Sequence, residues 1–280
     1  MRTWALLLFP ALAVLLGFFV LPMIFILITS LRSADGVSLD LHRYALFFAD
    51  AYFIEIVLRT LGVSFAVVLL TLILGYPLAY WLVRTDSRYR MFYRALVFFP
   101  LITSSIVRTF GWIILLSNNG FLNNVLGLLG FNQVQFLYQS SGIVIGLTHV
   151  MLPFMVLTLM SALANIDPAL EQASRSLGAS PWRTFRRIVM PMSIPGVTAG
   201  SLLVFALSAS AFVTPALLGG VQAPVMATLV YRQAVVVYDL SSAAATSILL
   251  LALTIILVIL YYRIAQPLPN RNRGSLEAAS

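Results

Sequence analysis

The segment LEQASRSLGASPWRTFRRIVMPMSIPG, residues 170–196, interrupts a chain of 280 residues of which 61% are hydrophobic. Four arginines, three prolines and a Gly-Ala-Ser sequence lie within it. Charged side chains are costly in hydrocarbon, so a membrane protein places such a segment outside the bilayer. The segment therefore marks a loop between two sets of apolar stretches.

The composition of the whole chain is that of a membrane protein. Mean hydropathy is +0.99 and only 9% of the residues are charged. All 17 basic residues are arginines, so a phosphate-loop lysine and Schiff-base chemistry are excluded. The chain has no cysteine, which excludes disulfides and thiolate metal sites. Basic loops beside anionic lipid explain the net charge of +8 better than nucleic acid does.

Six stretches are long and apolar enough to cross a bilayer, which takes about 20 residues. They lie at 4–30, 59–83, 93–116, 142–164, 194–218 and 243–264. The first run is longer than the roughly 7–15 apolar residues of a signal peptide, so we expect it to remain as an anchor. The sequence predicts an all-α polytopic membrane protein with one transmembrane domain over residues 1–280.

The arginines predict the orientation of these spans. If the N-terminus is cytoplasmic, twelve arginines face the inner side and four face the outer side. The inner set is Arg2, Arg84, Arg88, Arg90, Arg94, Arg175, Arg183, Arg186, Arg187, Arg263, Arg271 and Arg273, and the outer set is Arg32, Arg43, Arg59 and Arg232. This bias places both termini and the loop 165–193 in the cytoplasm. The outer segment 32–58 is expected to form a surface amphipathic helix capped by Asp50.

The cytoplasmic loop carries signals for two short helices. Asp167 followed by Pro168 is a helix start, and Gly178 is a stop that suits a left-handed backbone. Ser180 and Pro181 repeat the start signal. One apolar face is formed by Leu170, Ala173 and Leu177, and the other by Trp182, Phe185 and Ile188. Pro191 and Pro195 are expected to end the second helix before the next span.

These residues resemble the cytoplasmic loop of permease subunits of type I ATP-binding-cassette importers. That loop carries a Glu-Ala-Ala-x-x-x-Gly-x9-Ile-x-x-Pro-like motif, matched here at Gln172, Ala173, Ser174, Gly178, Ile188 and Pro191. Gln172 replaces the usual glutamate. Glu171 comes one residue early, where helix geometry turns it about 100° away.

The resemblance covers almost the whole chain and is greatest to the spermidine/putrescine-type branch. It rests on LGYPLAYWL (74–82), IVRTFGWIILLSNNGFLN (106–123), GLTHVMLPFMVL (146–157) and FVTPALLGG (212–220). It implies a bacterial inner membrane location, a second permease chain in a heterodimer, an external binding protein, and two ATPase subunits that bind ATP and Mg. The residues implied to dock on the ATPase are Leu170, Glu171, Gln172, Ala173, Ser174, Leu177, Gly178, Ala179, Trp182, Phe185, Ile188 and Pro191.

Five residues within the spans are candidates for the translocation path. Arg108 and its neighbour Trp112 lie in the third span, where a charge marks a functional site unless it reaches the headgroups. His149 is a hydrogen-bonded core histidine, a ligand or a proton relay, and the first is favoured. Thr214 and Pro215 are expected to interrupt the fifth helix and free backbone groups toward protein or a water-filled cavity.

Two other function classes remain as alternatives to an importer subunit. An intramembrane lipid-processing enzyme would need an acidic or thiol group, and the predicted spans contain none. A secondary carrier usually has acidic residues at mid-membrane for ion coupling. The sequence therefore favours a subunit without catalytic residues, metal or cofactor of its own. The branch resemblance implies a polyamine-like solute, and amino-acid-like, opine-like and phosphonate-like solutes remain open.

Overall fold

The computed structural model describes residues 14–32 and 42–265, and its elements over these residues are all helices. The elements are η1 (Leu16–Val20), α2 (Leu21–Leu31), α3 (His42–Ala49), α4 (Ala51–Arg84), α5 (Arg90–Ile102), α6 (Ser105–Leu116), α7 (Phe121–Leu128), α8 (Ser140–Ala164), α9 (Pro168–Ser176), α10 (Pro181–Thr184), η2 (Phe185–Val189), α11 (Met190–Ala209), α12 (Val213–Leu218), α13 (Met226–Tyr231), η3 (Arg232–Val236) and α14 (Leu240–Ala265). The predicted all-α class is confirmed.

Four helices in the described residues are long and apolar enough to cross a membrane. They are Ala51–Arg84, Ser140–Ala164, Pro181–Ala209 and Leu240–Arg263, and the bent pair that begins at Arg90 makes a fifth if it counts as one span. The protein is therefore a multi-pass membrane protein. Residues 4–13 of the predicted span 4–30 and both termini lie outside the described residues. The count of six spans and the side of the termini stay predictions.

The chain divides into two compact units. Unit 1 comprises Met1–Val63, Thr109–Ile143 and Ala209–Leu253, and unit 2 comprises Ser64–Arg108, Val144–Ser208 and Thr254–Ser280. In unit 1, a buried cluster of Phe47, Ile56, Met226 and Leu229 joins α3, α4 and α13. The side-chain oxygen of Thr60 accepts a hydrogen bond of 3.0 Å from the backbone N–H of Met226. This bond satisfies the first turn of α13 inside the core.

The outer segment differs from its prediction. Only His42–Ala49 forms a separate helix, and the following residues belong to α4, a single helix of 34 residues. Asp50 is a helix cap as expected, but it caps α4: its carboxylate accepts the Tyr52 N–H at 2.9 Å. The capped start makes residues 51–58 continuous with the second span.

In unit 1, the chain between α6 and α8 folds around one buried asparagine. Asn123 is 3% exposed and donates to the carbonyl oxygens of Ser117 at 3.2 Å and Val134 at 3.0 Å. It also accepts the Val134 N–H at 3.0 Å. The amide thereby joins α7 to the segment around Val134 that leads to α8. The next residue, Asn124, is exposed.

The exposed side chains of Asn124 and Ser180 allow a test of the predicted topology. In the cysteine-free chain, an impermeant maleimide added outside should label Asn124→Cys, and should label Ser180→Cys only after the membrane is opened. The physical reason is the excess of arginine on the predicted inner side. Leu116→Cys is the matched control and should react slowly from either side because that side chain is fully buried. Labelling of Ser180→Cys from outside would contradict the topology.

Two glycines in unit 2 hold α8 and α11 close together. A Cβ atom added at Gly196 would lie 2.3 Å from the Cβ of Ala162, and one at Gly200 would lie 2.4 Å from the side-chain oxygen of Thr158. Real Cβ atoms do not approach that closely, so only glycine fits at this helix spacing. Small residues at such contacts are typical of helix packing in membranes.

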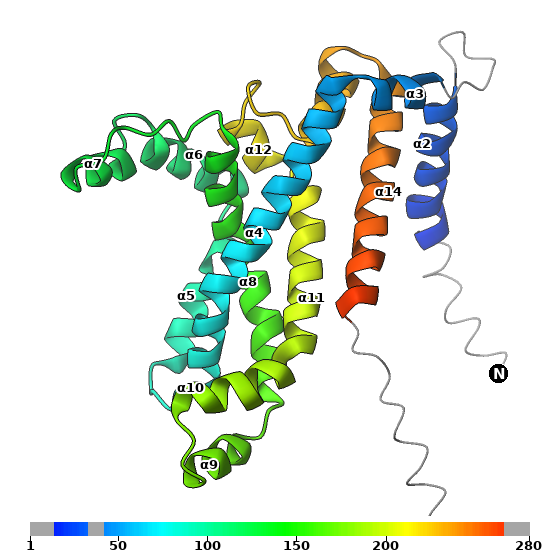
Figure 1. The fold of residues 1–280 in the computed structure, drawn as a ribbon. Coiled ribbons are helices and arrows are strands. Elements are labelled where there is room, and N and C mark those ends of the chain that lie inside the picture. Colours follow the sequence, from blue (N-terminus) through cyan, green and yellow to red (C-terminus); the bar gives the residue numbers. More distant parts are fainter. Residues whose placement is uncertain (1–13, 33–41, 266–280) are drawn as a thin grey trace, which may run out of the picture. The chain divides into compact units, whose positions relative to one another are not determined.

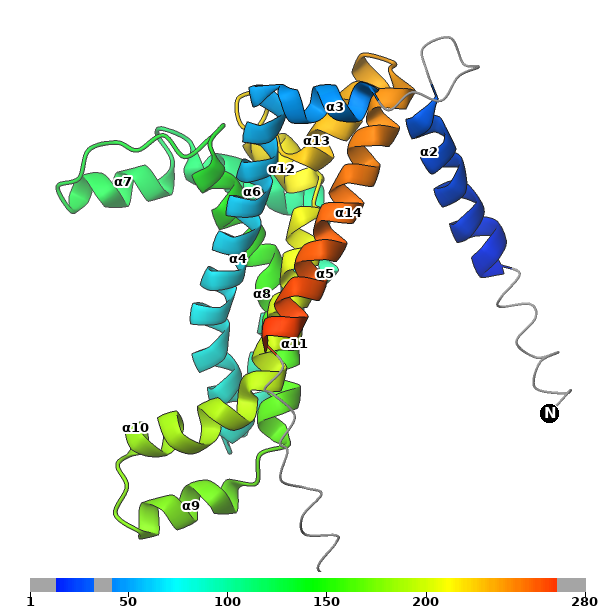
Figure 2. The ribbon, with the colours of Figure 1, turned by 45° about the vertical axis from the view of Figure 1, so that its right-hand side comes forward.

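The predicted end of the second loop helix at Pro191 and Pro195 is wrong. The helix runs on from Pro181 to Ala209, and Figures 1 and 2 show α10 turning into α11 as one ribbon. A π-helical turn, η2, precedes Pro191, and in it the Met190 N–H bonds to the Phe185 carbonyl. Such a turn shifts the hydrogen-bond register by one residue, so a proline can follow without ending the helix.

The third and fifth spans are also interrupted. Thr103 has an extended backbone between α5 and α6, which breaks the predicted span 93–116. The break after α11 lies at residues 210–212, one turn earlier than predicted. Thr214 and Pro215 therefore lie in the first turn of α12, where the missing N–H of proline leaves no hydrogen bond unmade.

Candidate functional site

The loop helices α9 and α10 form for local reasons and lie together at one end of unit 2 (Figures 1 and 2). The Asp167 carboxylate accepts the Ala169 N–H at 2.8 Å and caps α9. The Ser180 hydroxyl accepts the Arg183 N–H at 3.3 Å and caps α10. Between them, Gly178 has a φ of +80°, which is the left-handed conformation expected from the sequence.

The outward face of α9 is apolar and open. Leu177 is 88% exposed, and Leu170 is exposed as well. Gln172 and Ala173, the first two residues of the family-like motif, are also exposed. Exposed apolar side chains that share one helix face are typical of a surface that a partner protein covers.

Glu171 points the other way and is buried, with 6% of its surface exposed. One carboxylate oxygen accepts the Arg84 Nε–H at 2.8 Å and lies 2.8 Å from Arg84 Nη2. The other accepts the Tyr80 hydroxyl at 2.7 Å. The residue was predicted to be turned away from the motif position, and the structure shows that α4 receives it.

Three residues on α4 meet the loop and its following helix, and we call them the α4 strip: Tyr76, Tyr80 and Arg84. They are spaced by four residues and so share one face of the helix. The Tyr76 hydroxyl lies 2.6 Å from the Ser193 hydroxyl of α11. Phe185 of η2 packs edge-on against Tyr76 and Tyr80, with ring centroids 5.5 and 6.1 Å away. The strip therefore contacts α9, η2 and α11 in turn.

The two loop helices are also tied to each other. The hydroxyls of Ser174 and Thr184 lie 3.0 Å apart, and Thr184 is buried. Trp182 stacks on Phe185 with centroids 5.5 Å apart but is itself 69% exposed. The residues predicted to dock on an ATPase therefore differ in exposure. Exposed are Leu170, Gln172, Ala173, Leu177, Gly178, Trp182 and Pro191; Glu171 is buried, and half-buried are Ser174, Ala179, Phe185 and Ile188.

The candidate path residues fall in both units. In unit 2, the guanidinium of Arg108 donates to the Pro100 carbonyl at the end of α5, and its Nε is buried without a hydrogen bond in the described structure. His149 is half-buried in α8. In unit 1, Trp112 is half-buried and Thr214 and Pro215 are buried. Arg108 therefore supplies a donor to a carbonyl that the break after Ile102 leaves without a helical partner.

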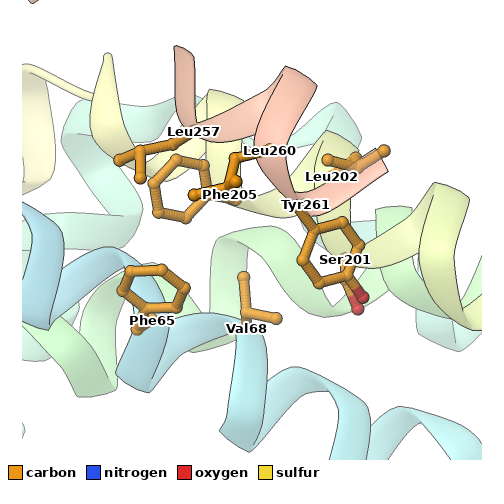
Figure 3. A pocket seen from close by; sticks show the side chains of 8 residues that line it. All are labelled: Phe65, Val68, Ser201, Leu202, Phe205, Leu257, Leu260 and Tyr261. Atoms are coloured by element: carbon orange, nitrogen blue, oxygen red, sulfur yellow. The ribbon is translucent and has the colours of Figure 1, made fainter. Parts of the chain in front are cut away.

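A pocket of about 280 Å³ lies in unit 2 between α4, α11 and α14 (Figure 3). The rings of Phe65 and Phe205 are 5.0 Å apart at one side, and Ser201 and Tyr261 lie toward the other. A polar solute would lose its hydrogen bonds to water here and regain few. The pocket as lined in this chain is therefore unsuited to a polar solute.

A second pocket, of about 350 Å³, lies in unit 1 beside α12. Its walls include three aromatic rings, Tyr52, Phe212 and Tyr231, together with Arg232. The centroids of Phe212 and Tyr231 are 4.9 Å apart. Aromatic faces suit organic cations, whereas an arginine suits anions, so the pocket alone does not select one class. Across residues 14–32 and 42–265, no cluster of three or more His, Cys, Asp or Glu residues could hold a metal ion.

Sequence reasoning missed the α4 strip. Its only signal in the sequence is the four-residue spacing of Tyr76, Tyr80 and Arg84 at the C-terminal end of the second predicted span. Arg84 was assigned to the positive-inside set, and this role does not distinguish it from Arg88 or Arg90. The partner of Glu171 lies 87 residues away in the chain, beyond the reach of any local pattern.

Comparisons with known proteins identify the family. Residues 71–268 match the family described as binding-protein-dependent transport system inner membrane component. The spermidine/putrescine transport system permease protein PotB of Salmonella typhimurium strain SL1344 is 33% identical over 258 residues, 90% of each chain. The PotB protein of Escherichia coli K12 is 33% identical over 90% of this chain and 94% of its own.

A solved structure shows the same fold. The bacterial alginate ABC transporter, in complex with an alginate pentasaccharide-bound periplasmic protein, matches with a TM-score of 0.79 and 22% identity over 95% of both chains. The loop helices α9 and α10 lie within residues 71–268, the part of the chain that matches the family. The chain belongs to the family of binding-protein-dependent transport system inner membrane components.

Proposed function

We propose that this chain forms half of the translocation pathway of an ATP-driven importer in the bacterial inner membrane. The observation that carries the proposal is the arrangement of α9, with exposed leucines on one face and a buried Glu171 anchoring the opposite face. A partner can bind the exposed face of such a helix while Glu171 stays bonded to α4. The chain is a transport subunit and not an enzyme.

The partners follow from this arrangement and from the relatives. ATP and Mg would bind to two separate ATPase subunits, and each would receive the exposed face of one pair of loop helices. A second homologous permease would complete the pathway in a heterodimer. An external binding protein would deliver the solute, as the periplasmic protein in the alginate transporter complex carries a pentasaccharide. Closure of the ATPases would move the loop and shift the spans to an outward-facing state.

We assign the solute to the polyamine class. The support is the 33% identity to spermidine/putrescine permeases over most of both chains. The rings of Tyr52, Phe212 and Tyr231 in the unit 1 pocket can contact ammonium groups. Amino-acid-like, opine-like and phosphonate-like solutes are the competing outcomes, because Arg232 in the same pocket would favour an anionic group.

Co-purification and reconstitution test the function. The tagged chain, purified in detergent from the membranes of its own cells, should retain an ATPase. Vesicles containing the complex should take up radiolabelled spermidine only with ATP inside and the binding protein outside. Uptake driven by a proton or sodium gradient without ATP would support a secondary carrier instead. A thermal-shift screen of the binding protein with spermidine, amino acids and phosphonates decides the solute class.

Arg108 gives a prediction about the pathway. We expect Arg108→Ala to lower spermidine uptake about tenfold or more at unchanged yield of the complex, because a charge-assisted hydrogen bond at the α5 break is lost. Arg108→Lys keeps the charge and can still donate to the Pro100 carbonyl, so it should retain most activity. Uptake at the wild-type rate in Arg108→Ala would return Arg108 to a headgroup-binding role.

A further inference from the structure

The buried carboxylate of Glu171 has its hydrogen-bonding capacity directed entirely at α4. Both of its oxygens accept bonds, one from Arg84 and one from Tyr80, at 2.7 to 2.8 Å. No other carboxylate in the described part of the chain is as fully buried. Charged groups are buried in this way only when paired, and the pair is then a short, directional contact.

Arg84 extends this contact to a third helix. Its Nη2 also donates to the Ile166 carbonyl at 3.0 Å, just after the end of α8. Arg84 is the last residue of α4, and its side chain is 18% exposed. A planar guanidinium with several donors can hold two acceptors in fixed geometry, which a lysine cannot do. The end of α4 is thereby fixed to the end of α8 and the start of α9.

The position of Glu171 on α9 opposes the exposed leucines. Leu170 precedes it by one residue, which is about 100° around the helix. Ser174 follows it by three residues on the same face and contacts Thr184 of α10. Glu171 and Ser174 therefore connect α9 directly to α4 and to α10, so a displacement of α9 pulls on both. The same α4 strip receives Phe185 of η2.

From these contacts, we propose that Arg84, Tyr80 and Glu171 form a strap that transmits movement of the loop helices into α4. The three are positioning residues: they act on the pathway through α4 and touch neither ATP nor solute. The inference rests on the proposed function, because it requires an ATPase that moves α9. It goes beyond docking, since it assigns the step after docking to residues that face away from the ATPase.

The strap is tested by the number of spermidine molecules imported per ATP hydrolysed in reconstituted complexes. Arg84→Met should lower this ratio about tenfold while ATP hydrolysis continues. The loop helices can still dock on the ATPase, but without the bond from Arg84 to Glu171 their movement no longer reaches α4. Arg84→Lys should recover part of the ratio. Glu55→Gln is the matched control, since it breaks the exposed Glu55–Arg59 ion pair elsewhere on α4 and should leave the ratio unchanged.

A merely structural pair gives a different result. Complexes lost to misfolding lower uptake and hydrolysis together, so an unchanged ratio in Arg84→Met overturns the proposal. Should Arg84→Met fail to assemble, Tyr80→Phe removes a single oxygen atom and one bond to Glu171. That variant should lower the ratio a few-fold at full assembly, and a wild-type ratio there overturns the proposal.

A second measurement separates this inference from the choice of solute. A nitroxide attached at Leu74→Cys, on an exposed position of α4, should change its spectrum between nucleotide-free and ATP–vanadate states. The change should disappear in the Arg84→Met background. If wild-type vesicles import no spermidine, the proposed solute fails, and the nitroxide still decides on the strap. A spectral change that persists in Arg84→Met overturns it.

Discussion

Gly178→Val should reduce ATP-driven uptake about fivefold to thirtyfold while the spans remain folded. Gly178 has a φ of +80°, and a β-branched residue in this left-handed conformation costs roughly 1–2 kcal/mol. No atom lies within 4 Å of a Cβ added there, so the effect comes from the backbone and not from a clash. The valine variant would favour an extended hinge and misplace α9 against its ATPase. Uptake per assembled complex measures it.

Gly178→Asn is the matched control for the hinge. Asparagine adopts the left-handed conformation more readily than valine, so its uptake should lie near the wild-type rate. Since the site is open, both side chains fit equally well in the folded loop. Wild-type uptake by Gly178→Val would show that the angle between α9 and α10 does not govern coupling.

Gly196→Val should destabilise the permease itself by about 1–3 kcal/mol, as overpacked positions do. Its Cβ would lie 2.3 Å from the Cβ of Ala162, and neither atom belongs to a flexible side chain end. Helices α8 and α11 must then separate, with loss of contacts along their length. The melting temperature of the purified complex should fall by about 2–4 °C for each kcal/mol.

Two variants check that packing is the cause. Gly111→Val changes a helical glycine whose added Cβ meets nothing within 4 Å, and its melting temperature should stay near wild type. Ala162→Gly combined with Gly196→Val removes the opposing methyl group and should recover part of the loss. Equal destabilisation by Gly111→Val and Gly196→Val would show that the close approach to Ala162 is not the cause, because valine forms helices at least as well as glycine.

Local chemistry accounts for the parts of the fold that the sequence predicts. Apolar length predicts where α8 and α14 lie, and the caps at Asp167 and Ser180 predict where the loop helices begin. Gly178 predicts its own left-handed turn. Each of these rules acts within a few residues, so a single chain read in order is enough to apply it.

Prolines and span boundaries were harder to predict because their cost depends on the surroundings. Pro191 was expected to end a helix, yet the π turn before it keeps the helix intact. The break at Thr103 was not expected, and it is stabilised by the Arg108 guanidinium eight residues from Pro100. A helix can continue or break at a residue where a backbone hydrogen bond is missing, depending on whether another group bonds to the freed backbone atoms. Which groups lie close enough to do so is decided by the tertiary structure.

The sequence by itself determined the membrane class, the two loop helices with their glycine hinge, and the apolar face of Leu170 and Leu177. The tertiary structure alone decided which groups receive the Glu171 carboxylate. Its partners Tyr80 and Arg84 lie 91 and 87 residues away, on a helix that meets α9 only after the spans have packed. A buried carboxylate is stable only where donors converge on it, and packing chooses those donors.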